Sequence, residues 1–277
     1  MKDFKIGLQL YSIRDEMEKD MNKTLEKVKD MGYDYVEFAG YYGKTADQVL
    51  DLLKKHDLEC VSVHQTHEVF LNNAEEEVAF LQTIGAKYSA VPWMDLDKHA
   101  GSDKFDQTKE EFVKVGQILK DAGIVFLYHN HDFEFKTYKG KYLLDWLYES
   151  VPAELLQTQI DTCWVNYAGV DPVDYIKKYS GRAPVIHLKD FVSDKKNSGS
   201  VYALIDEDGN VDEEASLEDN GFEYRPLGEG VQDIPSIIEA AKEAGTEYLI
   251  VEQDESVTCS PLEAAKRSRE YLRTLGL

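Results

Sequence analysis

The sequence predicts a (β/α)8 barrel in a single domain that covers residues 1–277. Eight short apolar or β-branched runs alternate with longer segments whose apolar residues recur at helical spacing. Eight such units in 277 residues match the usual size of this barrel, about 250 residues. A doubly wound open sheet is the main alternative, but no GxGxxG motif follows any of the runs. The barrel is therefore the predicted fold.

The predicted strands follow one another at even spacing. They are FKIGLQLYS (4–12), YVEFAG (35–40), ECVSVHQ (59–65), YSAVPW (88–93), IVFLYHNH (124–131), LQTQIDTCW (156–164), APVIHLKD (183–190) and YLIVEQD (248–254). Segments such as MNKTLEKVKDMGY and ADQVLDLLKKHDL supply the amphipathic helices between them. Four helices are expected to end at a glycine placed just before the next strand: Gly32, Gly85, Gly123 and Gly245.

One connection is too long for a simple loop between a strand and a helix. Residues 191–224 are polar and rich in turn formers, and they separate the seventh strand from a helix that begins near Asp233. We expect this insertion to lie over the barrel mouth and to contain a small hairpin around DEDGN (206–210).

Composition narrows the class of protein. The chain has 31 Lys and Arg against 53 Asp and Glu, a net charge of −22, which disfavours binding to nucleic acids or to anionic membrane surfaces. Its cysteines (Cys60, Cys163 and Cys259) form no CxxC pair, so neither a disulfide framework nor a structural zinc knot is expected. The sequence shows no secretion signal and no apolar stretch of about 18 residues. A cytoplasmic protein is expected, with homo-oligomerisation left open.

Chemically capable side chains gather where the predicted strands end. In a (β/α)8 barrel the active site lies at this end of the strands. Five of the seven histidines occur there, together with acids, a lysine and two tryptophans: Glu37, His64, His67, Trp93, His129, His131, Asp161, Trp164, His187, Lys189, Asp190, Glu252 and Asp254. A single histidine in a strand is more often a hydrogen-bonded core residue than a ligand, so the gathering as a whole is the informative observation.

Asp161, His187 and Glu252 end three adjacent predicted strands at similar depth. Each has a structural alternative, since Asp161 could cap the next loop and Glu252 could pair with Lys189. Buried carboxylates cost several kcal/mol unless they are paired or bind a cation, so their convergence indicates one divalent metal ion. Carboxylate and imidazole donors suit Mn²⁺, Co²⁺, Fe²⁺ or Zn²⁺, and a sulfur ligand from Cys163 is the weaker expectation.

The order of the motifs YHNHDFEF, IDTCW, VIHLKD, LGEG and VEQD resembles the xylose isomerase-like superfamily of sugar phosphate isomerases and epimerases. The resemblance covers essentially the whole chain. It implies one divalent ion held by Glu, Asp, His and Glu, of which Asp161, His187 and Glu252 carry over. The fourth position departs from the family, because His129 stands where many members have glutamate. His129 or His131 is then the implied fourth ligand, and Glu134 is a third candidate.

The resemblance implies a sugar isomerase or epimerase of carbohydrate metabolism that works through an enediolate. Glu252 is the expected base, His131 and Lys189 are expected to assist it, and His129, Asp161, His187 and Glu252 would hold the ion. The expected contacts to an unphosphorylated sugar or polyol are Glu37, His64, His67, Trp93 and Trp164. Because His129 weakens the two-glutamate mechanism of the epimerases, a dehydratase or lyase acting on a keto sugar or inosose is the alternative. A sugar-binding barrel without catalysis is a further one.

Overall fold

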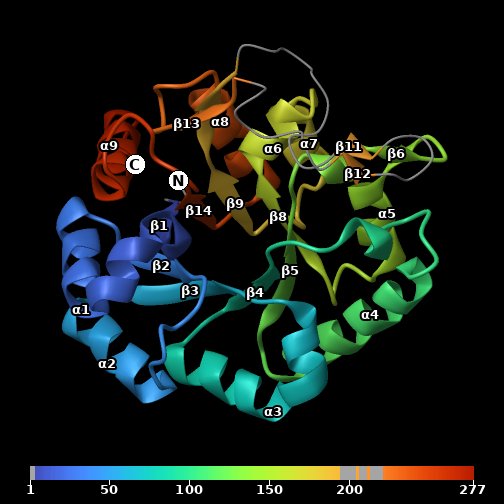
Figure 1. Cartoon of the computed structure of the whole chain (residues 1–277), viewed down its shortest axis with the longest axis horizontal. Helices are drawn as coiled ribbons and strands as arrows, with labels where there is room; N and C mark the ends of the chain where they lie inside the picture. The colour runs from blue at the N-terminus through green and yellow to red at the C-terminus, as the bar shows by residue number, and fades with distance from the viewer. Residues whose placement is uncertain (1–3, 194–203, 206–210, 213–220) are drawn as a thin grey trace.

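Eight parallel strands close into a barrel in the computed structural model, which describes residues 4–193, 204–205, 211–212 and 221–277 (Figure 1). The order around the barrel is β1-β14-β9-β8-β5-β4-β3-β2. All eight predicted runs form these strands, and most strands end a few residues earlier than expected. The strands are β1 (Lys5–Gln9), β2 (Tyr35–Phe38), β3 (Glu59–His64), β4 (Tyr88–Val91), β5 (Val125–His129), β8 (Gln157–Asp161), β9 (Val185–Leu188) and β14 (Tyr248–Val251).

Helices surround the barrel on its outside (Figure 1). They are α1 (Arg14–Met31), α2 (Ala46–Lys55), α3 (His67–Ile84), α4 (Phe105–Asp121), α5 (Leu143–Ser150), α6 (Thr162–Tyr167), α7 (Pro172–Lys178), α8 (Ile234–Ala244) and α9 (Pro261–Thr274), with short 3-10 helices η1 (Leu10–Ile13), η2 (Leu96–Lys98) and η3 (Phe133–Phe135). Gly32, Gly85 and Gly245 end α1, α3 and α8 with φ between 77° and 91°, and Gly123 follows α4 with φ 76°. Only glycine adopts this backbone at low cost, so the predicted helix stops are confirmed. None of the helices in the described part of the chain combines the length and apolar character of a bilayer span.

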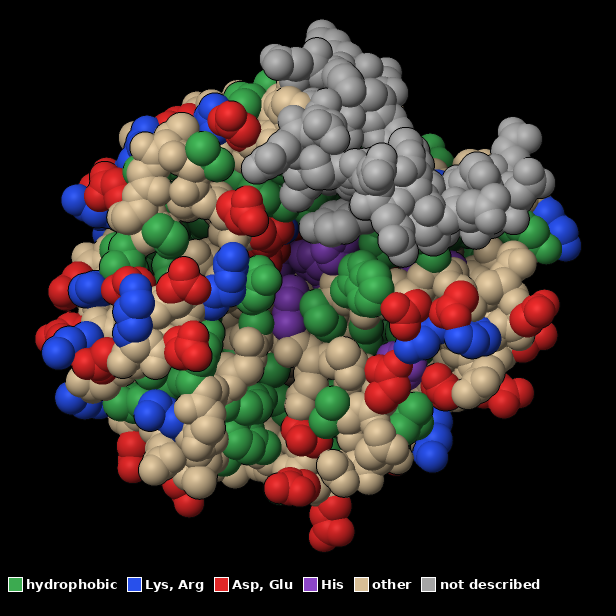
Figure 2. Space-filling model, viewed as in Figure 1, with side chains coloured by type: hydrophobic (Ala, Val, Ile, Leu, Met, Phe, Trp, Pro, Cys, Tyr) green, Lys and Arg blue, Asp and Glu red, His purple; other side chains and the backbone are tan. Residues whose placement is uncertain are grey.

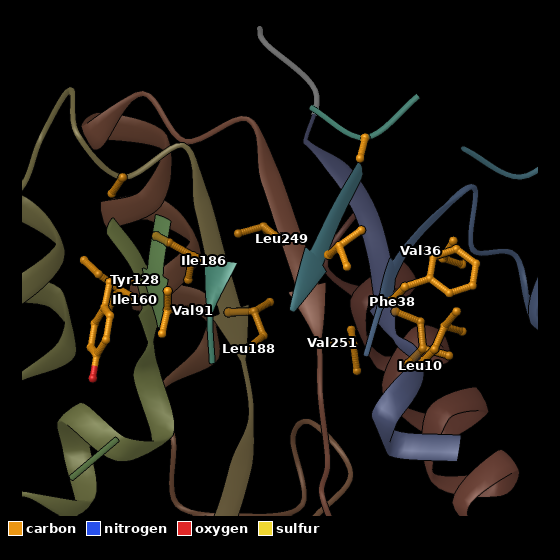
Figure 3. Close-up of a cluster of buried hydrophobic side chains, with 14 of the residues drawn as sticks. Leu10, Val36, Phe38, Val91, Tyr128, Ile160, Ile186, Leu188, Leu249 and Val251 are labelled. Atoms are coloured by element: carbon orange, nitrogen blue, oxygen red, sulfur yellow. The ribbon is translucent and has the colours of Figure 1, made fainter. Parts of the chain in front are cut away.

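The larger apolar core lies between the strands and the helices. Strand side chains that point outward from the barrel pack there against buried residues of the helices. They include Val36, Ile160, Ile186 and Leu249 (Figure 3). A smaller apolar cluster, which includes Val185 and Ile250, fills the barrel interior. Successive side chains of a strand point to opposite faces, so the two cores alternate along each strand.

The same alternation carries polar side chains to the barrel mouth. Val185 lies in the interior cluster, and His187 follows it by two residues on β9. Ile250 and Glu252 repeat the relation at the end of β14. The side chains that fill the barrel interior are therefore apolar up to Val185 and Ile250, and ionisable two residues further towards the mouth.

A bulge in β3 directs His64 into the barrel. Val36 pairs with Cys60 and Glu37 with Ser62, which leaves Val61 as the extra residue on β3. A bulge shifts the alternation of a strand by one position. His64 consequently faces Glu37, with 3.0 Å between His64 Nε2 and Glu37 Oε1.

Only parts of the predicted insertion, residues 191–193, 204–205, 211–212 and 221–224, belong to the described residues. Its two ends pair as β10 (Asp190–Val192) and β13 (Glu223–Arg225), antiparallel. Inside it, β11 (Leu204–Ile205) and β12 (Val211–Asp212) pair antiparallel on either side of 206–210, where the hairpin was expected. A further hairpin, β6 (Thr137–Tyr138) with β7 (Lys141–Tyr142), follows β5. The expected cover of the mouth by residues 194–203, 206–210 and 213–220 falls outside the described residues.

The LGEG motif is held by one buried carboxylate. Asp190 Oδ2 accepts hydrogen bonds from the backbone N–H groups of Gly228 and Gly230, both at 3.0 Å. Its Oδ1 accepts from the N–H groups of Phe191 and Gln232. A Cβ on Gly230 would lie 2.1 Å from Asp190 Oδ1, so glycine is required for this close approach.

Asp190→Ala is expected to lower the free energy of unfolding by about 3 kcal/mol, because it leaves buried N–H donors without an acceptor. Asp233→Ala, which removes the N-cap of α8, should cost only about 1 kcal/mol. Urea unfolding monitored by circular dichroism measures both. Equal losses in the two variants would contradict the assigned role of Asp190.

Candidate active site

A cavity of about 570 Å3 opens at the carboxyl ends of the barrel strands. Figure 2 shows histidine side chains at the bottom of a hollow near the centre of this face. Several expected site residues line the cavity: His64, Trp93, His129, His131, Lys189 and Glu252. Tyr11, Tyr224 and Glu255, which were not expected there, line it as well, together with Asp254 and with Arg14, a cation expected near the rim.

Four buried side chains converge at the base of the site, and two of them, His129 and Glu252, line the cavity. His129 ends β5, Asp161 ends β8, His187 lies on β9, and Glu252 follows β14. These strands are consecutive around the barrel, and one ligand atom from each residue lies within 4.8 Å of the others. His187 Nδ1 is 2.8 Å from Glu252 Oε2, and His129 Nε2 is 3.7 Å from Asp161 Oδ2.

Asp161 serves two purposes with its two oxygens. Oδ1 caps α6 by accepting from the N–H groups of Cys163 and Trp164, at 2.8 and 3.2 Å. Oδ2 is buried and faces the site, where it forms an ion pair with Lys189 Nζ at 3.1 Å but accepts no well-aligned hydrogen bond. Asn130 fixes the end of the strand, because its amide both donates to the Asp161 carbonyl and accepts from the Asp161 N–H. The capping alternative and the ligand prediction are therefore compatible.

Lys189 places a buried ammonium group among the carboxylates. Its Nζ is 3.1 Å from Asp161 Oδ2, 3.0 Å from Glu252 Oε2 and 3.1 Å from Asp254 Oδ2. Burial alone would lower the pKa of Lys189, but these three carboxylates hold the pKa well above its usual value. Lys189 is therefore charged at neutral pH.

Glu37 was expected to contact substrate, and it is not among the residues that line the cavity. It is fully buried one layer below, where its Oε1 lies 2.7 Å from His187 Nε2. Gln9 and Gln159 donate to its two oxygens at 2.7 and 2.6 Å. Burial opposes its ionisation, but the imidazoles of His64 and His187 hold the pKa of Glu37 well below its usual value.

Sequence reasoning missed the two glutamines. Gln159 precedes Asp161 by two residues on the same strand, so alternation along β8 places both inside the barrel. This spacing was the available signal. Gln9, the last residue of β1, carried the weaker signal of a polar residue at the end of an apolar strand.

His67 and Trp164 were also expected to contact substrate, and neither is among the residues that line the cavity. His67 begins α3, and its Nε2 lies 3.1 Å from Glu111 of α4. Trp164 belongs to α6 because β8 ends at Asp161, and it is fully buried. Its ring stacks on Phe222 and lies 5.5 Å from the ring of His131. Trp164 thus packs against His131, which lines the cavity, without lining the cavity itself.

Glu134 points away from the four converging side chains. Its Oε2 accepts from the N–H of His131 at 2.7 Å, and its Oε1 accepts from the Tyr128 hydroxyl at 2.5 Å. His131 lines the cavity with its ring 5.4 Å from that of His129. Burial and the charge of Lys189 lower the pKa of His131 to about 3, so its imidazole is neutral at physiological pH.

Burial raises the pKa of Glu134 to about 8. In the unfolded chain a glutamate titrates near pH 4.3, so the unfolded state releases a proton that the folded state keeps. The contribution of Glu134 to the free energy of unfolding should therefore fall as pH rises from about 4 to 8 and level off above that range. Glu134→Gln carries no proton and should show a smaller decline between pH 5 and pH 9.

Urea unfolding at the two pH values tests this difference, with Glu110→Gln on the exposed face of α4 as the control. The control should decline as the wild type does. If Glu134→Gln declined by the same amount as the wild type, the raised pKa would be refuted.

The donor set fits a divalent cation. Four carboxylates (Glu37, Asp161, Glu252 and Asp254) stand in or beside the site. Burial would lower the pKa of His187, but Glu37 and Glu252 raise it to about 10. His187 and Lys189 therefore supply two positive charges beside these four carboxylates, and burial raises the pKa of Asp161 to about 6 in the absence of a metal ion. Imidazole and carboxylate ligands without thiolate suit Mn²⁺, Co²⁺, Fe²⁺ or Zn²⁺.

Comparison with known proteins agrees with the fold. Residues 25–275 match the family described as xylose isomerase-like TIM barrel. Inosose dehydratase of Mesomycoplasma hyopneumoniae (strain 7448) is 26% identical over 275 residues, which cover 92% of this chain and 88% of the relative.

Two solved structures extend the comparison. A sugar phosphate isomerase/epimerase from Parabacteroides distasonis superposes with a TM-score of 0.77 at 21% identity, over 98% of this chain and 94% of that one. L-ribulose 3-epimerase gives a TM-score of 0.67 at 13% identity, again over 98% and 94%. These proteins are named for the reactions they catalyse, so the chain stands among enzymes. With its closed eight-stranded barrel and a match over residues 25–275, the chain belongs to the xylose isomerase-like TIM barrel family.

Proposed function

We propose that the protein is a metal-dependent lyase that eliminates a β-oxygen substituent from a keto sugar or keto polyol. One observation carries this proposal. The carboxylate of Glu252 and the ammonium of Lys189 lie 3.0 Å apart, and both line the cavity. A base and an acid side by side suit removal of a proton and of the neighbouring oxygen from one face of a sugar ring.

The proposed roles follow from the charges of the residues. His129, Asp161, His187 and Glu252 would hold the ion, which would acidify the C–H group next to a substrate carbonyl. Burial raises the pKa of Glu252, but Lys189 and His187 hold it well below the usual value, so Glu252 is ionised and can accept that proton. Lys189 gives its proton to the leaving oxygen. A C–H and a C–O bond break, a C=C bond forms, and water or an alcohol departs.

Elimination is preferred to epimerisation because the second glutamate is absent from its expected place. Epimerisation needs proton transfer on both faces of a planar enediolate, which a glutamate pair performs in the epimerases that this sequence resembles. Here His129 occupies that position, and Glu134 is turned towards Tyr128 and His131. The relatives named inosose dehydratase support the same choice. An isomerase or epimerase is the second candidate, favoured by the neutral imidazole of His131 on the cavity wall.

Product analysis tests the proposal. Protein loaded with Mn²⁺ is incubated in deuterium oxide with an inosose and with a 3-keto-glucoside. Elimination produces a conjugated enone that absorbs in the ultraviolet. Deuterium incorporation or an epimer without that absorbance would favour the second candidate, and no change in either compound would refute both.

Metal analysis identifies the fourth ligand. His129→Ala is expected to weaken Mn²⁺ binding by more than about tenfold, because loss of a ligand exceeds the effect of losing its supporting hydrogen bond. His131→Ala and Glu134→Ala should retain one equivalent of metal, since neither residue belongs to the four-residue cluster. Inductively coupled plasma mass spectrometry after dialysis against Mn²⁺ gives the stoichiometry. Loss of metal in His131→Ala with retention in His129→Ala would reverse the assignment.

A further inference from the structure

The barrel mouth is divided into two arcs. The four converging side chains come from β5, β8, β9 and β14, which are neighbours around the barrel. The opposite arc, β1 to β4, contributes aromatic side chains to the cavity. Tyr11 follows β1 and Trp93 follows β4, with exposed fractions of 41% and 46%. Across the described residues, Tyr11 and Trp93 are the aromatic members of the exposed large hydrophobic set, and both line this cavity.

The two rings flank the mouth and are held in place. In the barrel order, β1 and β4 are separated by β2 and β3, so their loops stand on well-separated sides of the opening. The Arg14 guanidinium lies 4.3 Å from the centre of the Tyr11 ring and donates to the Asp254 carbonyl at 2.6 Å. The ring of Trp93 meets that of Phe133 edge to face, with 6.4 Å between centres. Tyr11 and Trp93 are thus exposed at the entrance of the cavity and held by neighbouring side chains. Such aromatic rings are suited to stacking against a ring of a bound ligand.

The size and charge of the cavity agree with a second ring. About 570 Å3 lies within the range of pockets that enclose drug-sized ligands, roughly 300–1,000 Å3, whereas a single sugar ring is much smaller than such a ligand. Arg14 and Lys189 are the cations among the described lining residues. Lys189 pairs with the Asp254 carboxylate, whereas Arg14 donates to the Asp254 backbone carbonyl. The acids Glu252, Asp254 and Glu255 line the same cavity and disfavour an anionic ligand group. The second ring is therefore expected to be uncharged.

We propose that the substrate is a neutral two-ring glycoside whose second ring binds at the mouth between Tyr11 and Trp93. The placement of the reacting sugar beside Glu252 and Lys189 rests on the proposed function. The mouth subsite itself rests on the exposed aromatic rings and the cavity volume. Stacking and burial of an aromatic aglycone should strengthen binding by about tenfold over a methyl aglycone.

Calorimetric titration with phenyl β-D-glucopyranoside and methyl β-D-glucopyranoside tests the subsite. The wild-type protein loaded with Mn²⁺ should bind the phenyl glucoside about tenfold more tightly. Trp93→Ala and Tyr11→Ala should lose most of this preference, because each removes one ring face from the mouth. Trp93→Phe should retain much of it because a ring face is kept, and Val113→Ala, exposed on α4, should behave as wild type.

A phenyl glucoside that binds no better than the methyl glucoside, including the case in which neither binds, overturns the proposal. So does a preference that survives both alanine substitutions. Neither probe carries a ketone, so this outcome is independent of the elimination assay. A retained phenyl preference without enone formation would uphold the subsite and refute the proposed reaction.

Discussion

Glu252→Gln is expected to lower turnover of a keto-sugar substrate by about 10²–10⁴-fold, the usual contribution of a positioned general base. The amide has nearly the size of the carboxylate but cannot accept the α-proton. Two rates should fall together: formation of the enone, followed by its ultraviolet absorbance, and exchange of the α-proton with deuterium oxide. Each requires the C–H bond to break. The variant should also bind Mn²⁺ more weakly, since one carboxylate ligand is gone.

Glu239→Gln is the matched control for this substitution. Glu239 is an exposed residue of α8 and faces solvent away from the cavity, so its turnover should equal that of the wild type. Measurements at saturating Mn²⁺ separate the chemical role from the role as ligand. If Glu252→Gln exchanged the α-proton at the wild-type rate under these conditions, another residue would have to be the base.

Lys189→Met should separate the two halves of the reaction. The methionine fills a similar volume but has no proton for the leaving oxygen, so enone formation should be lost while α-proton exchange by Glu252 continues.

The ammonium of Lys189 is also the partner of Asp161, Glu252 and Asp254. Its removal leaves buried carboxylates unpaired, which typically costs about 3–5 kcal/mol. The metal-free variant should therefore unfold at a lower urea concentration than the metal-free wild type.

Mn²⁺ should restore much of the lost stability, because the ion supplies positive charge to Asp161 and Glu252. Lys189→Arg keeps the charge and should stay close to wild type in stability. Parallel urea titrations with and without Mn²⁺ make the comparison. Loss of exchange together with elimination in Lys189→Met would show that Lys189 is needed for proton abstraction, contrary to the assigned division of roles.

The fold could be predicted from the sequence because strand and helix periods are local properties. Each apolar run produced a barrel strand, and the four glycine stops adopted positive φ. The convergence of Asp161, His187 and Glu252 followed from the barrel alone, since parallel strands bring their carboxyl ends to one rim.

The orientation of side chains beyond the strand ends could not be predicted in this way. His67 and Trp164 come directly after strands, but both lie on the helices that follow, where the period of two no longer applies. The depth of Glu37 depends on hydrogen bonds from Gln9 and Gln159, which belong to strands remote in sequence. Trp164 is buried partly by Phe222, whose position depends on the far end of the insertion.

The two arcs of the mouth come from successive segments of the gene. Tyr11 and Trp93, the residues of the proposed mouth subsite, precede residue 100, and the four converging side chains follow it. A crossover between homologous genes in the segment that joins β4 to β5 would therefore combine one parent's recognition loops with the other parent's chemistry. Divergence of specificity in such a barrel can proceed by recombination or by changes in two short loops, without passing through inactive ancestors.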